Sequence, residues 1–325
     1  MNKKIIFGIL ISLVLVYLSV RGINFTDVQN VLQKIQLPYV MLFMLLISLI
    51  QYLRSYRWGV ILQPMGTIDQ LSLFSVTSVG FMVIAALPAR LGELARPYLI
   101  SKRSSIKMPS AVGTIIVERV LDSFTIFIIA VVILFFIDLP SWMIHSSILF
   151  FLIAVTMFAA IMILILHRNT ALKFINVILN KLPGKFAPKI DAMIHHFIDG
   201  LQIVTNVNIL LYLFFLSAVI WLVDVLAIYV LLLSFGFMLP VVASFVVMIV
   251  LIVGIAIPTA PGFIGNWHFA CVLALSLFGL SKADALSFAV VYHFLSMVIL
   301  LVFGVAFLPF NKFSISDMTK QMNHQ

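Results

Sequence analysis

The chain has 325 residues, of which 63% are hydrophobic and only 10% are charged, and its mean hydropathy is +1.22. Soluble domains contain roughly 45–50% apolar and about 25% charged residues, so this composition excludes a soluble enzyme, a disordered chain and a coiled coil. The apolar residues form long unbroken runs, which excludes an outer-membrane barrel built from alternating segments. The sequence therefore predicts an all-α, polytopic integral membrane protein.

Six apolar runs are long enough to cross a hydrocarbon core about 30 Å thick. The first run, 5–20, is not followed by a small-residue cleavage site, so we interpret it as a retained span rather than a signal peptide. Segment 21–36 has apolar residues at helical spacing, which predicts a short amphipathic helix on the membrane surface. The other five spans are predicted over residues 37–53, 111–137, 147–166, 209–234 and 285–309.

Two further apolar segments, at about 71–107 and 241–280, are interrupted by proline and glycine. Irregular backbone at membrane depth is tolerated only inside protein or along a wet cavity, and transporters build substrate sites from such broken helices. We therefore predict two re-entrant helical hairpins that enter from opposite faces of the membrane. All of these elements belong to one transmembrane domain, 1–325.

The distribution of lysine and arginine predicts the orientation in the membrane. Treating both interrupted segments as hairpins places the basic segments 54–70, 90–107 and 167–206 on one side, together with both termini. We therefore expect a cytoplasmic-membrane protein with both termini in the cytoplasm. Segment 167–206 has the pattern of two amphipathic helices, which we expect to lie on the anionic leaflet. The net charge of +9 accordingly predicts anionic membrane lipids as partners and no nucleic acid.

Ionisable residues within apolar runs mark a substrate or ion pathway by default. Arg90 and Arg96 stand three residues on either side of Glu93, so one helical turn would bring both guanidinium groups to this carboxylate and leave N–H donors for a phosphate. A structural ion-pair cluster at the hairpin tip is the alternative. Glu118 and Asp122 share one face of a continuous apolar run and repel each other unless a cation lies between them.

We expect the face that carries Glu118, Arg119 and Asp122 to meet the tip of the first hairpin, where the two groups neutralise each other. Asp224 lies in the middle of a span without a neighbouring base, so it is a candidate proton carrier, with a helix–helix hydrogen bond as the alternative. His293 in the last span is a second proton-coupling candidate. The intramembrane acids outnumber the bases by one, which predicts that Asp224 is protonated; the count sets Glu93, Glu118, Asp122 and Asp224 against Arg90, Arg96 and Arg119.

The second interrupted segment contains Pro261, Gly262 and Gly265, where glycine allows close backbone approach and a following helix N-terminus offers N–H groups to an anion. Asn266 and His268 are predicted to line the same cavity, although a structural role is the commoner one for a lone histidine. Cys271, the single cysteine, is interpreted as a small buried apolar residue. No nucleotide loop, metal-ligand spacing or nucleophile motif is present in the sequence, so we expect no cofactor and no enzymatic activity.

Three motifs occur in order on this polytopic chain: Pro-x-Arg-x-Gly-Glu-x-x-Arg at 88–96, Glu-Arg-x-x-Asp at 118–122 and Pro-x-x-Pro-Gly-x-x-Gly at 258–265. Together they resemble the flippase-like transmembrane family typified by the membrane part of lysylphosphatidylglycerol synthase. The resemblance spans nearly the whole chain. It implies movement of lipids or lipid-linked intermediates, including anionic phospholipids, hopanoids and polyprenyl-linked sugars.

Carried over to this sequence, the resemblance implicates the charged residues of the first two motifs and Pro261, Gly262 and Gly265. His268 stands where the family commonly has a glutamate, and the aminoacyltransferase domain of the synthase is not found in this sequence, so synthase activity is not implied. The alternative to a translocase is a non-transporting, lipid-binding accessory subunit of an envelope-biosynthesis enzyme. A homo-oligomer is compatible with either function, and lipid headgroup transfer is a third, enzymatic alternative.

Overall fold

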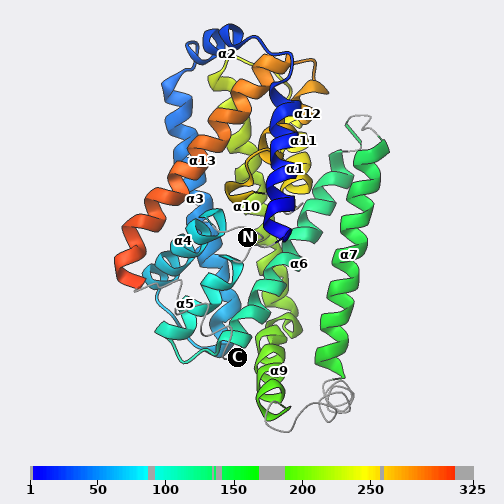
Figure 1. Cartoon of the computed structure of the whole chain (residues 1–325). Helices are drawn as coiled ribbons and strands as arrows, with labels where there is room; N and C mark the ends of the chain where they lie inside the picture. The colour runs from blue at the N-terminus through cyan, green and yellow to red at the C-terminus, as the bar shows by residue number, and fades with distance from the viewer. Residues whose placement is uncertain are drawn as a thin grey trace.

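The computed structural model describes residues 3–86, 92–133, 135–136, 141–167, 187–256 and 260–311. These residues form α-helices joined by short turns and 3-10 segments, without a β-strand among them. Figure 1 shows long helices running side by side along the length of the molecule. The helices are α1 (Lys3–Val20), α2 (Phe25–Leu32), α3 (Leu37–Leu62), α4 (Gln70–Ala86), α5 (Ala95–Arg103), α6 (Met108–Ile133), α7 (Ser141–Leu166), α9 (Ala187–Leu201), α10 (Val207–Ser234), α11 (Val242–Ala256), α12 (Asn266–Ser276) and α13 (Lys282–Asn311).

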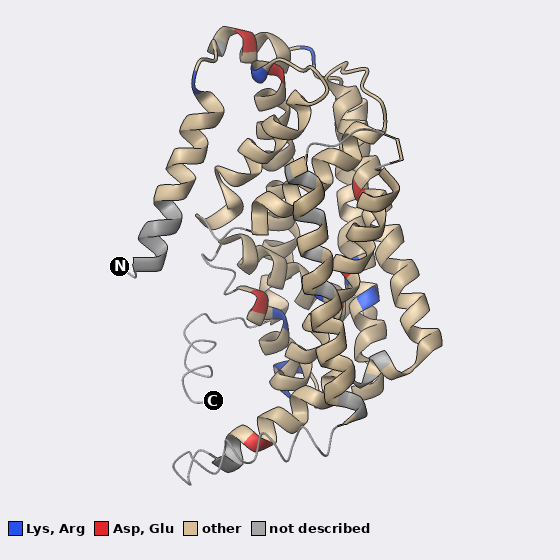
Figure 2. Ribbon diagram, turned by 90° about the vertical axis from the view of Figure 1, so that its right-hand side faces the viewer, with Lys and Arg blue, Asp and Glu red and all other residues tan. Residues whose placement is uncertain are grey.

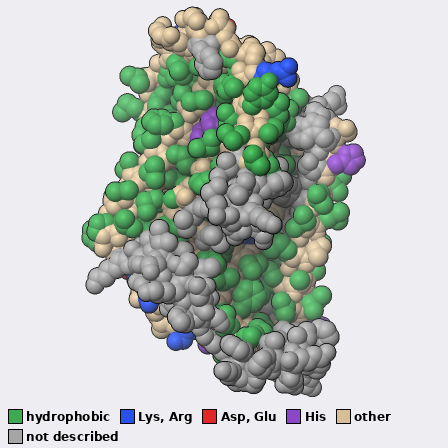
Figure 3. All heavy atoms as spheres, in the orientation of Figure 1, with side chains coloured by type: hydrophobic (Ala, Val, Ile, Leu, Met, Phe, Trp, Pro, Cys, Tyr) green, Lys and Arg blue, Asp and Glu red, His purple; other side chains and the backbone are tan. Residues whose placement is uncertain are grey.

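The outer surface of the bundle is apolar. Within the described residues, three helical segments are long and apolar enough to cross a membrane: Leu37–Met65, Val207–Ser234 and Lys282–Asn311. Large hydrophobic side chains remain exposed along the helices, and Figure 3 shows them covering much of one face. Figure 2 shows charged residues at the two ends of the helices and at one level inside the lower half. These features confirm an all-α polytopic membrane protein.

Helix α3 is longer than the sequence predicted. It continues to Leu62, so Arg54 and Arg57 lie in its last turns and not in a loop beginning at residue 54. Both arginine side chains line a cavity inside the bundle, which allows the helix to continue past residue 53. Helix α3 also contributes to all three hydrophobic cores, through the two residue groups Phe43–Ile50 and Trp58–Leu62. Helix α3 therefore packs against all three parts of the hydrophobic core and carries both arginines.

Both predicted interruptions are present, and the second lies against the end of α4. Helix α4 ends at Ala86 before α5, and α11 ends at Ala256 before the 3-10 turn η4 (Pro261–Phe263) and α12. A Cβ placed on Gly262 would lie 3.9 Å from the carbonyl oxygen of Ala85, so the second tip sits against the end of α4. The first helix, α1, closes over this place, because Ser12 Oγ accepts a hydrogen bond from the Ala260 N–H at 2.9 Å. Entry of the two hairpins from opposite membrane faces stays a prediction.

Helix α9 packs against α6 instead of lying free on a lipid surface. A Cβ on Gly200 would come within 2.0 Å of the carbonyl oxygen of Ser110, so only glycine permits this approach. Ile198 and Leu201 are buried on the same side. The expectation of two amphipathic helices on the leaflet therefore differs from the structure for the second of them, and the first lies outside the described residues.

Candidate functional site

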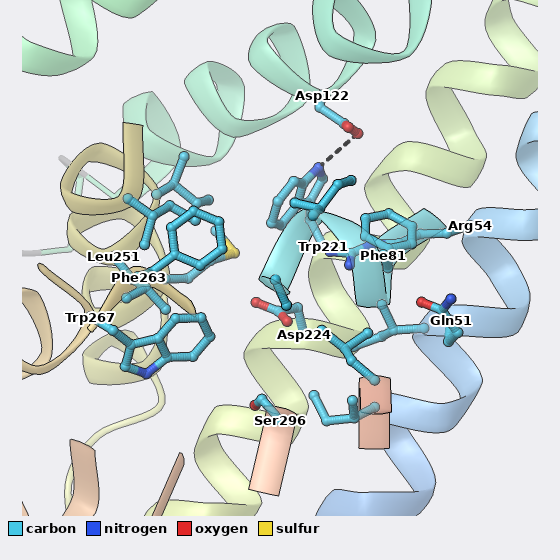
Figure 4. Close-up of a pocket in the computed structure, with 18 of the residues that line it drawn as sticks. Gln51, Arg54, Phe81, Asp122, Trp221, Asp224, Leu251, Phe263, Trp267 and Ser296 are labelled. Carbon is cyan, nitrogen blue, oxygen red and sulfur yellow. Dashed lines mark hydrogen bonds between the residues drawn. The ribbon is translucent and has the colours of Figure 1, made fainter. Parts of the chain in front are cut away.

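A cavity of about 310 Å³ lies where α3, α6 and α10 meet the two interrupted segments and α13. Figure 4 shows Leu251, Phe263 and Trp267 on one side of this space and residues of α3 and α4 on the other. Its wall is thus apolar on the side of Leu251, Phe263 and Trp267, and Arg54 lies on the opposite side (Figure 4). The charged residues that line it are Arg54, Arg57, Glu93, Glu118, Arg119, Asp122 and Asp224. Such a cavity suits an amphiphile rather than a purely polar solute.

Arg57 is the centre of the ion-pair cluster at the cavity wall. Its guanidinium group bonds both carboxylate oxygens of Asp122, at 2.5 and 3.1 Å, and Glu118 Oε1 at 2.9 Å. Ser217 and Trp221 complete the cluster, because Arg57 donates to Ser217 Oγ at 2.6 Å and the Trp221 indole donates to Asp122 at 3.2 Å. Two buried carboxylates on one helix face therefore coexist because a cation from α3 lies between them.

Arg96 neutralises the other oxygen of Glu118, at 2.8 Å, as the sequence predicted for the tip of the first hairpin. The Arg96 side chain is only 1% exposed and does not line the cavity. Its guanidinium group stacks over the Trp58 ring at 4.3 Å. A Cβ on Gly80 would come within 2.3 Å of Arg96 Cγ, so this glycine makes room for the arginine stem. Arg96 is therefore an ion-pair partner of Glu118, and its binding of a lipid headgroup stays a prediction.

Two other arginines face the cavity without a bound partner. Arg54 and Arg119 line it, and neither makes a hydrogen bond or ion pair with any described residue. Arg54 instead stacks near the rings of Phe81, at 5.3 Å, and Trp221, at 6.0 Å. The guanidinium donors of both arginines are thus available to an anion, which they would bind with planar geometry.

Asp224 also lines the cavity and makes no hydrogen bond to a described residue. Its electrostatic neighbour is Arg54. The charge count that predicted a protonated Asp224 is wrong, because it omitted Arg54 and Arg57. With both included, the described cluster holds four bases and four acids: Arg54, Arg57, Arg96 and Arg119 against Glu93, Glu118, Asp122 and Asp224.

The second interrupted segment contributes apolar wall residues and packing contacts rather than polar ligands. Phe263 and Trp267 line the cavity, whereas five residues predicted there do not: Pro261, Gly262, Gly265, Asn266 and His268. Asn266 donates to the Gly254 carbonyl at 3.1 Å, which joins α12 to α11. His293 bonds the Gly262 carbonyl at 2.7 Å and packs edge-on to His268, with ring centroids 4.9 Å apart. His293 therefore holds the 3-10 turn η4 to α13.

Among the other predicted residues, Glu93 lines the cavity and Arg90 lies outside the described residues. The prediction missed Arg54 and Arg57, and Arg57 is the cation that bonds both Glu118 and Asp122. A signal for them was present, because they are three residues apart and helical hydrophobic spacing continues past them to Leu62.

Comparison with known proteins places this chain in a family. The family model of the lysylphosphatidylglycerol synthase TM region matches residues 5–304. A UPF0104 membrane protein of Methanothermobacter thermautotrophicus is 25% identical over 308 residues, and the match covers 90% of each chain. A UPF0104 membrane protein of Methanocaldococcus jannaschii is 26% identical over 313 residues, which cover 91% of each chain.

The family match runs from α1 through most of α13 and so includes every helix that lines the cavity. The resemblance carried by the three sequence motifs is thereby confirmed. This all-α membrane protein belongs to the family defined by the lysylphosphatidylglycerol synthase transmembrane region.

Proposed function

We propose that this protein translocates an anionic lipid or lipid-linked intermediate across the cytoplasmic membrane. The observation that carries the proposal is the pair of cavity-facing guanidinium groups, Arg54 and Arg119, opposite an apolar wall. A phosphate accepts charge-assisted hydrogen bonds from such donors, while apolar walls tolerate the start of an acyl or prenyl chain. A volume of about 310 Å³ holds a headgroup, and the chains would remain in lipid.

The place of the cavity favours movement over simple storage. It lies where two interrupted helices meet, and broken helices at such a position are the usual gates and sites of transporters. We propose that both segments are re-entrant and that the tips separate as the headgroup passes. The hydrogen bonds between Ser12 and Ala260 and between His293 and Gly262 would break and re-form during this step.

A scrambling assay tests this function. Purified protein is reconstituted in liposomes with phosphatidylglycerol that carries a fluorescent acyl label, and the outer-leaflet label is quenched chemically. We expect more than about half of the label to become accessible to the quencher, because the protein moves labelled lipid from the inner to the outer leaflet. Protein-free liposomes and liposomes containing the Arg54→Gln/Arg119→Gln double variant are the controls. Equal label protection in all three preparations would overturn the translocase proposal.

The alternative is an accessory subunit that holds a lipid for an envelope-biosynthesis enzyme. The same cavity supports it, because binding alone needs no opening of the tips. Native mass spectrometry distinguishes the two functions: co-purified anionic lipid without scrambling favours the accessory role. Absence of both bound anionic lipid and scrambling contradicts both proposals.

Asp224 remains our candidate for proton coupling, now supported by its position in the cavity next to Arg54 rather than by a charge count. Asp224→Asn should preserve folding, because Asp224 makes no hydrogen bond to a described residue. We expect this variant to bind phosphatidylglycerol normally and to lose any dependence of scrambling on an imposed pH gradient. If the scrambling rate of the wild type does not depend on the pH gradient, Asp224 has no role in proton coupling.

We propose that α5 faces the cytoplasm and α2 the exterior; the two lie at opposite ends of the molecule (Figure 1). In a Cys271→Ala background, an impermeant maleimide should label Asp27→Cys in intact cells and label Lys102→Cys only after permeabilisation. Cys271 itself is fully buried, so its removal lowers background without exposing a new site. The reverse labelling pattern would invert the topology.

A further inference from the structure

Three buried side chains in the cavity wall have no hydrogen-bond partner among the described residues: Gln51, Ser296 and the indole N–H of Trp267. Both amide atoms of Gln51 are unpartnered although the residue is only 2% exposed, and Ser296 Oγ is unpartnered at 6% exposure. Both residues line the cavity. Burying a polar group without a partner is unfavourable, so a ligand in the cavity that bonds to these groups would gain affinity from them.

Ser296 differs from several other helical serines in this protein, although the hydroxyl groups of Ser78 and Ser244 are also without a partner among the described residues. Serines within helices commonly donate to a carbonyl three or four residues earlier, and Ser287 on the same helix does so to Ala283 at 2.7 Å. Ser48 and Ser217 on neighbouring helices follow the same pattern. Ser296 makes no such bond, so its hydroxyl remains available at the cavity wall.

Gln51 lies near Arg54, one of the two arginines that we propose bind the anion. It precedes Arg54 by three residues on α3, which corresponds to about 4.5 Å along the helix axis. Figure 4 shows Gln51 from α3 and Ser296 from α13 on two sides of Asp224. A group bound between them therefore lies within a few bonds of an anion held by Arg54. The amide offers both a donor and an acceptor, which matches a hydroxyl rather than a cation or an alkyl group.

We propose that Gln51 and Ser296 form a neutral hydrogen-bonding subsite for a hydroxylated portion of an anionic lipid headgroup. This inference rests on the proposed function and narrows its substrate class to lipids in which hydroxyl groups lie close to the phosphate. Arg54 and Arg119 bind the charge, and the subsite distinguishes hydroxylated headgroups from alkyl headgroups of the same charge. The discrimination arises because an alkyl group would leave the buried amide and hydroxyl without partners.

The test compares two lipids that differ only in hydroxyl groups. Phosphatidylglycerol and phosphatidyl-n-propanol have the same charge and a three-carbon headgroup, and their binding to purified protein in detergent is measured by native mass spectrometry. Wild-type protein should bind phosphatidylglycerol about threefold to tenfold more tightly, as expected for one or two hydrogen bonds. Gln51→Leu and Ser296→Ala should each reduce this preference and leave phosphatidylpropanol binding unchanged.

Ser244→Ala is the matched control, since Ser244 is also buried and unpartnered but does not line the cavity. The Ser244→Ala variant should keep the full wild-type preference for phosphatidylglycerol over phosphatidylpropanol. Thermal unfolding of each variant identifies any that fails to fold, and Ser296→Ala removes only one oxygen. Equal binding of the two lipids by wild type, or a preference that survives both cavity variants, would overturn the subsite. Failure to bind either lipid would instead contradict the proposed function.

Discussion

Replacing Arg57 with Met should unfold the protein at markedly lower temperature. Among the described residues, the change leaves Asp122 with only the Trp221 indole and removes one of the two arginines that pair with Glu118. Removing one partner of a buried ion pair costs about 3–5 kcal/mol, because the remaining charge is uncompensated. For a protein of this size, we expect the unfolding temperature in detergent to fall by roughly 10 °C.

A control and a rescue variant make this prediction specific. Lys107→Met removes a positive charge from an exposed position and should change the unfolding temperature little. Arg57→Met combined with Asp122→Asn removes a charge of each sign and should recover part of the loss. An unfolding temperature for Arg57→Met that equals that of Lys107→Met would show that the cluster does not hold α3 to α6.

The Arg54→Gln/Arg119→Gln double variant should lose lipid binding while keeping its fold. Neither arginine makes an ion pair with a described residue, so neither change leaves a broken pair behind. A hydrogen bond to a charged group contributes about 1.5–3 kcal/mol, so each single substitution should weaken binding of phosphatidylglycerol roughly 10- to 100-fold. Arg54→Lys should recover charge but not the planar fork, and so restore binding only in part.

Arg103→Gln is the matched control for these substitutions, because Arg103 is an exposed arginine outside the cavity. Its binding of phosphatidylglycerol should equal that of the wild type. Binding is followed by native mass spectrometry, with thermal unfolding as the check on folding. If the double variant retains wild-type affinity, the anion is held elsewhere and the cavity arginines have another role.

Composition and periodicity were sufficient to predict the membrane class, the main helices and the two breaks in them. These features depend on local chemistry: long apolar runs need a lipid or protein interior, and proline and glycine end helices wherever they occur. The need for a cation beside Glu118 and Asp122 also followed from the sequence, because two carboxylates on one buried helix face repel each other.

Tertiary structure decided which cation meets them. Arg57 is 61 and 65 residues away from these acids in sequence, and only the rotation of α3 in the bundle brings it there. The same packing turns Arg96 away from the cavity behind Gly80 and places Arg54 and Arg119 in its wall. Gln51 and Ser296 became recognisable only once their missing partners were visible. The cost of burying a charge lets the sequence predict that each buried charge is paired. Which residue is the partner depends on how the helices pack.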